Sequence, residues 1–138
     1  MDFMAKHGIQ GVVGGGSAEG GAMHRVVLAW QEAHARIGKH LELGERLCFG
    51  FHFYIADDRE QGMREAAKYY EENMKMFGPL RLVRALSDEQ IEIMGDPARA
   101  PHAKLPRIED AVHSGGFLCG SPEQIIEHLK ALEERYPG

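Results

Sequence analysis

The sequence contains little that would place it in a specialised class of protein. Only two of its 138 residues are cysteines, Cys48 and Cys119, and neither belongs to a CxxC pair. This excludes a disulfide framework and favours a reducing, cytoplasmic setting. No apolar run reaches the roughly 18 residues that a membrane span needs, and no charged-then-apolar signal segment opens the chain. We therefore expect a cytoplasmic protein with no membrane partner.

Basic charge is scarce as well. Lys and Arg number 16 against 21 Asp and Glu, so the formal net charge is -5. Because nucleic-acid binders carry a basic footprint, we expect no nucleic acid as a partner. The eight histidines and two cysteines show none of the close spacing that structural zinc requires, and we expect no metal site.

The chain is organised around the stretch from Ile9 to Gly38. A short apolar run ends in three glycines, Gly14 to Gly16, and Ser17 then precedes an amphipathic helix from Ala22 onward. A strand, a turn and a helix in this order are typical of α/β proteins. The eight residues before this stretch have the pattern of a helix end closed by glycine.

The glycine turn has two interpretations. Its backbone amides and the following helix N-terminus could bind a phosphate group. However, the turn does not match GxGxxG, and it lacks the lysine of a P-loop. The alternative is that the glycines only allow a tight connection between strand and helix.

A second predicted strand covers residues 47–56, and its side chains alternate between two faces. One face is bulky and apolar, whereas the other is small at first and polar later, with no charge. We therefore expect both faces to be buried under helices. His52 and Tyr54 come near the carboxyl end of this strand, where α/β proteins place their sites. Both are candidate pocket residues, and the alternative for His52 is a hydrogen-bonded core residue.

Helices account for most of the remaining chain. The pattern predicts a long helix over 59–77, a helix over 88–94 capped by Ser87, a short helix within 106–114 and a final helix that begins at Ser121. Residues 95–106 contain three prolines and predict a loop. Cys119 is expected to be a small buried residue.

Three segments in this order resemble the C-terminal portion of the luciferase-like flavin monooxygenases, the bacterial luciferase family. They read MAKHGIQGVVGGG, RLCFGFHFYIADDREQGMREAAKYY and GFLCGSPEQIIEHLKALEERYPG. The resemblance implies an α/β fold that is a partial (β/α)8 TIM-type barrel. About two βα units and a helical insertion at about 78–116 would form one partial domain over 1–138, incomplete as a stand-alone barrel.

The resemblance also implies a function. Such proteins use reduced FMN, or the deazaflavin F420, and O2 to oxidise an aldehyde, an alkane or a similar organic substrate. Gly15, Gly16 and Ser17 match the turn beside the flavin, and His52 and Tyr54 would line the substrate pocket. No catalytic residue is assigned, because most of the family's catalytic positions lie in strands that this sequence lacks.

This implied enzyme would be active only with the rest of its barrel. Its expected partner is therefore a missing barrel segment or another copy in a homo-oligomer. The alternative is a non-catalytic barrel fragment that serves only as an oligomerising or interaction module.

Overall fold

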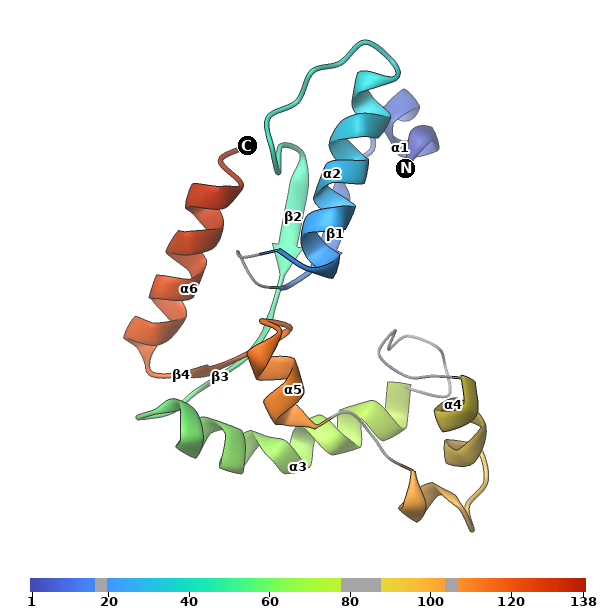
Figure 1. The fold of residues 1–138 in the computed structure, drawn as a ribbon, viewed down its shortest axis with the longest axis vertical. Helices are drawn as coiled ribbons and strands as arrows, with labels where there is room; N and C mark the ends of the chain where they lie inside the picture. The colour runs from blue at the N-terminus through green and yellow to red at the C-terminus, as the bar shows by residue number, and fades with distance from the viewer. Residues whose placement is uncertain (17–19, 78–87, 104–106) are drawn as a thin grey trace.

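The structure, a computed structural model, describes residues 1–16, 20–77, 88–103 and 107–138. Parallel strands are interspersed with helices along the described chain, which confirms the α/β class (Figure 1). The elements are α1 (Asp2–His7), β1 (Gly11–Gly14), α2 (Ala22–Ala35), β2 (Leu47–Gly50), β3 (His52–Ile55), α3 (Arg59–Phe77), α4 (Asp88–Met94), the 3-10 helix η1 (Ala100–His102), α5 (Ile108–His113), β4 (Phe117–Gly120) and α6 (Pro122–Arg135). The predicted cap at Ser87 lies outside the described residues.

All strand pairing among the described residues is parallel. β1 pairs with β2 from Gly11↔Leu47 to Gly14↔Gly50, and α2 connects the two strands. β3 pairs with β4 from His52↔Phe117 to Ile55↔Gly120, and the connection runs through α3, α4 and α5. Parallel pairing through helical crossovers is the arrangement that βαβ units produce.

The strand prediction needs two corrections. The expected single strand over 47–56 is divided at Phe51 into β2 and β3. A further strand, β4, precedes α6, so the described chain holds three strand–helix units rather than about two. The sequence did not predict β4, because its four residues, Phe117 to Gly120, are too few to show an alternation of apolar and polar side chains. The strong helix start at Ser121 follows directly.

The first of two hydrophobic cores lies between α2, α6 and the β1–β2 pair. Its buried residues come from three elements and from the chain end, and Leu47, Phe49 and Phe51 pack against them. Its members are Val13, Met23, Val27, Leu132 and Tyr136. The Tyr136 ring stacks on Phe49 at 5.3 Å, and its hydroxyl lies 3.1 Å from His24 Nδ1. These contacts hold the end of α6 against α2.

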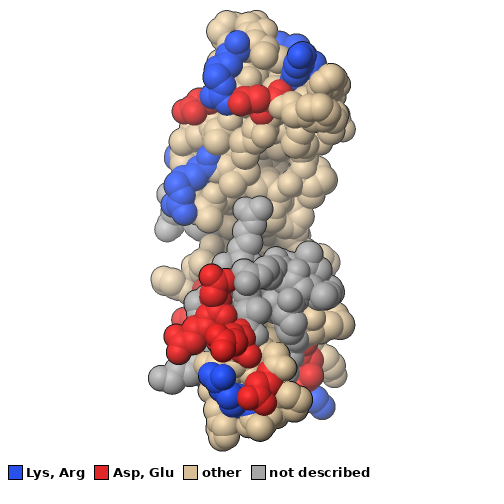
Figure 2. All heavy atoms as spheres, turned by 90° about the vertical axis from the view of Figure 1, so that its right-hand side faces the viewer, with Lys and Arg blue, Asp and Glu red and all other residues tan. Residues whose placement is uncertain are grey.

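The second core lies where α3 and α5 cover β3 and β4, in the lower half of Figure 1. Tyr54 of β3 and Phe117 of β4 pack against its buried residues. These are Ala66, Tyr70, Met74, Ile108 and Cys119. The strands from 47 to 55 therefore run from one core into the other, and Figure 2 shows a narrower region between the two halves of the molecule.

The expectation that both strand faces are buried is wrong. Val12 is 81% exposed, Phe53 60% and Ile55 51%, and Cys48 is exposed as well. The reason is that α2 and α6 cover only one side of β1 and β2, and no described element covers Val12 and Cys48 on the other side. Phe53 and Ile55 on β3 are similarly uncovered.

The start of α6 confirms its sequence signal. The Gln124 N–H donates to Ser121 Oγ at 3.4 Å, and the Ser121 N–H donates to Gln124 Oε1 at 3.0 Å, with Pro122 at the first helical position. This reciprocal pair is a capping box. Gly8 likewise closes α1 in the left-handed conformation, at φ 69°.

None of the helices that the structure describes is long and apolar enough to cross a membrane.

On the face seen in Figure 2, acidic side chains gather on the lower half and basic ones mostly on the upper half.

Candidate functional site

The glycine turn begins at the carboxyl end of β1, beside the end of β2. The Gly15 N–H donates to Gly50 O at 2.6 Å, which extends the strand pairing by one bond. This amide is therefore already paired and is not free for a phosphate oxygen. Gly16 is buried, and Ser17 lies outside the described residues.

Packing explains why Gly15 and Gly16 are glycines. A Cβ at Gly15 would overlap the Phe51 ring, including its Cγ at 2.9 Å, and a Cβ at Gly16 would lie 2.9 Å from Met23 Cβ. At Gly14, by contrast, a Cβ would meet no atom within 4 Å. The geometry thus favours the second interpretation of the sequence, a tight turn that admits the neighbouring side chains.

His52 and Tyr54 lie on the same strand, and both side chains contact protein groups. The exposed His52 ring stacks on Phe117 with an interplanar angle of 4° and centroids 6.4 Å apart. The Tyr54 hydroxyl donates to Glu65 Oε2 on α3 at 3.0 Å. The structure therefore directs Tyr54 toward a helix, and it does not bring Tyr54 together with the glycine turn.

Tyr54 and Glu65 influence each other's ionisation. The negative Glu65 carboxylate accepts the tyrosine hydrogen bond and raises the pKa of Tyr54 above its usual value. Hydrogen bonds from Gln61 and then from Tyr54 lower the pKa of Glu65 below 4.5. Tyr54 is therefore a neutral hydroxyl at physiological pH, held by a charged acceptor.

We expect Tyr54→Phe to raise the pKa of Glu65 toward 4.5 without fully restoring it, because the bond from Gln61 to Glu65 at 2.9 Å remains. A carboxylate with a lowered pKa stabilises the fold above its unfolded pKa, and this stability is lost as pH falls through the folded pKa. As the pH falls from the unfolded to the folded pKa of Glu65, the free energy of unfolding of Tyr54→Phe should therefore decrease less than that of the wild type.

Carboxyl carbon NMR of Glu65 across pH measures this shift. Tyr69→Phe is the matched control, because Tyr69 is an exposed tyrosine on α3, the helix that carries Glu65. An unchanged Glu65 pKa in Tyr54→Phe would show that the hydrogen bond does not form in solution.

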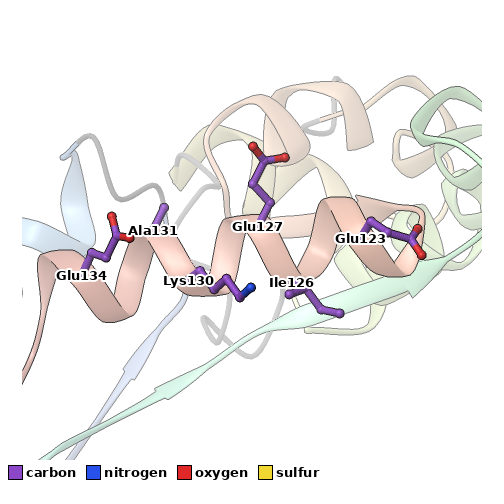
Figure 3. Close-up of a pocket in the computed structure, with 6 residues that line it drawn as sticks. All are labelled: Glu123, Ile126, Glu127, Lys130, Ala131 and Glu134. Atoms are coloured by element: carbon purple, nitrogen blue, oxygen red, sulfur yellow. The ribbon is translucent and has the colours of Figure 1, made fainter.

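Neither of two hollows formed by described residues includes the glycine turn. The larger, about 560 Å³, follows the outer side of α6, and all of its lining residues belong to that helix (Figure 3). They are Glu123, Ile126, Glu127, Lys130, Ala131 and Glu134. A hollow formed by one helix alone has no opposing wall, so this is the open side of α6 rather than a cleft. Its three carboxylates against one lysine also disfavour an anionic ligand.

The smaller hollow, about 30 Å³, lies between α3, α5, β4 and α6. It is lined in part by Arg59, Cys119, Gln124 and His128. Ligand pockets usually measure about 300–1,000 Å³, so this space is far too small for a flavin or an organic substrate. Burial raises the pKa of the Cys119 thiol, which keeps it protonated and unreactive at neutral pH. This agrees with the expectation that Cys119 is a small buried residue.

The start of α6 is also occupied by the chain's own groups. Besides the capping box, the Ser121 hydroxyl donates to Glu123 Oε2 at 2.8 Å. A phosphate at this helix end would have to displace a carboxylate that already benefits from the helix dipole. The described residues contain no group of three or more His, Cys, Asp or Glu side chains that could hold a metal ion.

Neither the glycine turn nor these two hollows of the described residues gives a flavin an enclosed site in the single chain. The Gly15 amide is paired, Gly16 is buried, and neither hollow combines a suitable size with opposing walls. The exposed sides of β1, β2 and β3 remain open to solvent.

The geometry does not identify a protein family, and comparison with known proteins does. The family model described as luciferase-like monooxygenase matches residues 1–137. No curated protein and no solved structure matches the chain. Because the family match covers essentially the whole sequence, the chain belongs to the luciferase-like monooxygenase family.

Proposed function

We propose that this chain forms part of a flavin-dependent monooxygenase, which uses reduced flavin and O2 to oxidise a small organic substrate such as an aldehyde or an alkane. The family match over residues 1–137 carries this proposal. Members of the family typically use reduced flavin, and reduced FMN is the cofactor that we propose, with F420 as the alternative. The flavin supplies the reaction with O2, while the protein binds and shields it.

The proposed place of the site is the carboxyl end of the parallel strands of a (β/α)8 barrel. Gly15, Gly16 and Ser17 would lie beside the flavin, and His52 and Tyr54 near the substrate. The position of the turn at the ends of β1 and β2 supports this, because barrel enzymes bind ligands at that end of their strands. The single chain leaves the site open, so we infer that further strands, from another segment or another copy, complete it.

Fluorescence titration of FMN with the 138-residue chain tests this function. We expect quenching with a dissociation constant in the micromolar range. If no binding is seen up to about 1 mM FMN, the binding free energy is weaker than about 4 kcal/mol. That result would contradict the proposal that this chain forms part of a flavin-dependent enzyme. That outcome would favour the second candidate, a non-catalytic interaction module, which the open shape of the two hollows and the paired Gly15 amide among the described residues support.

A further inference from the structure

The small hollow between α3, α5, β4 and α6 contains a nitrogen atom without a partner. His128 lines this hollow and is half-buried, but its Nε2 atom is buried, and no described protein group forms a hydrogen bond with it. Buried polar atoms are rarely left in this state, so such an atom indicates a bound water molecule or ion. The hollow of about 30 Å³ exceeds the roughly 10–15 Å³ that one water molecule needs. One small guest therefore fits beside His128 Nε2.

The polar side chains that line this hollow can all donate hydrogen bonds. The Arg59 guanidinium is always protonated, and Gln124 accepts the Ser121 N–H with its Oε1, which leaves its amide nitrogen as a donor. His128 carries a proton on Nε2 in one of its two neutral tautomers. None of the other described lining residues is acidic. A set of donors fits an anion, and the Arg59 charge repels a cation.

Arg59 occupies a position that helix stability does not explain. It is the first residue of α3, where the helix dipole favours a negative charge and disfavours a positive one. Neither ion pair between described residues includes Arg59. Its charge acts on the hollow, because burial raises the pKa of the Cys119 thiol and the positive Arg59 opposes this rise. An anion in the hollow would supply Arg59 with an opposite charge.

Two carboxylates near the starts of α3 and α6 have other partners. β3 and β4 are parallel, so these two helices begin at the same end of the strand pair (Figure 1). Asp58 Oδ1 accepts the Gln61 N–H at 2.7 Å, and Glu123 Oε2 accepts the Ser121 hydroxyl at 2.8 Å. Neither carboxylate lines the hollow. The positive ends of two helix dipoles therefore lie near a space that neither carboxylate neutralises.

We propose that this hollow binds one halide-sized anion, chloride, which accepts hydrogen bonds from His128 Nε2, the Arg59 guanidinium and the Gln124 amide. Sulfate and phosphate, with four oxygen atoms each, are too large for the space. The bound ion would join the start of α3 to α6, whose other end lies in the first core through Leu132 and Tyr136. The proposal goes beyond the monooxygenase activity and does not depend on flavin binding.

NMR of the His128 imidazole tests the proposal, with sodium chloride replacing sodium gluconate at constant pH and ionic strength. We expect the Nε2 resonance of the wild type to shift saturably with a dissociation constant of about 10 mM, because Arg59 is exposed and water screens its charge. Arg59→Gln should weaken this binding about tenfold, because it removes the only positive charge in the lining. Arg64→Gln is the matched control, since Arg64 is an exposed arginine of α3 that does not line the hollow.

Bromide shows where the ion lies, because it is close to chloride in size and scatters X-rays anomalously. Crystals soaked in bromide should give an anomalous peak beside His128 Nε2 in the wild type and in Arg64→Gln, and none in Arg59→Gln. A water molecule at this place in bromide-soaked wild-type crystals would overturn the proposal. So would a His128 shift that rises linearly with chloride, or a saturable shift with equal affinity in Arg59→Gln.

Discussion

Replacement of Gly15 by alanine is expected to destabilise the chain by about 1–3 kcal/mol, the range for overpacked sites. The new Cβ would overlap the Phe51 ring at its Cδ1, Cε1 and Cγ atoms. Cγ is bonded to Cβ, so it can move away only if Phe51 changes its χ1 rotamer or if its backbone shifts. The same displacement would weaken the bond from Gly15 N–H to Gly50 O.

Gly14→Ala is the matched control for this prediction. It adds the same methyl group one residue earlier, where no atom lies within 4 Å. Urea unfolding of both variants should give a lower midpoint for Gly15→Ala and a nearly unchanged midpoint for Gly14→Ala, with similar slopes. Equal midpoints would contradict the packing explanation and restore a ligand as the reason for the glycines.

Trp30→Ala is expected to lower the free energy of unfolding by about 3–5 kcal/mol. The side chain is 3% exposed, its ring centroid lies 4.5 Å from that of the buried His34 with the two rings tilted by 54°, and its Nε1–H donates to Glu45 O at 3.1 Å. This bond ties α2 to the loop that leads into β2. Since domains have only about 5–15 kcal/mol of stability, the loss would be a large fraction of the total.

Trp30→Phe separates the two contributions, because it keeps most of the ring packing and removes the hydrogen bond. It should cost about 1–3 kcal/mol, since the Glu45 carbonyl loses its donor and a smaller ring leaves a void. Leu28→Ala, at a 38% exposed position of the same helix, serves as the control and should change stability by much less. A Trp30→Ala midpoint equal to that of Leu28→Ala would show that the contacts of Trp30 with His34 and Glu45 do not form as described.

Helices and their ends could be predicted from sequence because their signals are local. The capping box at Ser121, the left-handed Gly8 and the bounds of α3 depend on residues within one or two turns. Strand burial could not be predicted in this way. The uncharged alternation over residues 47–56 is typical of a strand covered on both sides, whereas coverage depends on elements far away in sequence, and the described chain supplies them on one side only.

At the candidate site too, the sequence predicted the position of the residues along the chain but not their tertiary contacts. The glycine turn was found where expected, but the partners of its residues, Gly50 O for Gly15 and Met23 for Gly16, follow from strand register and helix packing. The contact between Tyr54 and Glu65 depends on how α3 lies against β3. Sequence placed both residues correctly on their elements, and it contained no signal for the hydrogen bond between them.

We propose that this member of the luciferase-like monooxygenase family binds flavin only when its open strands are covered. FMN titration at increasing chain concentration, with sedimentation of the same samples, tests it most directly. We expect FMN fluorescence to be quenched only at chain concentrations where sedimentation shows an associated species. Tight FMN binding by a monomer, or a stable dimer that binds no flavin, would contradict it.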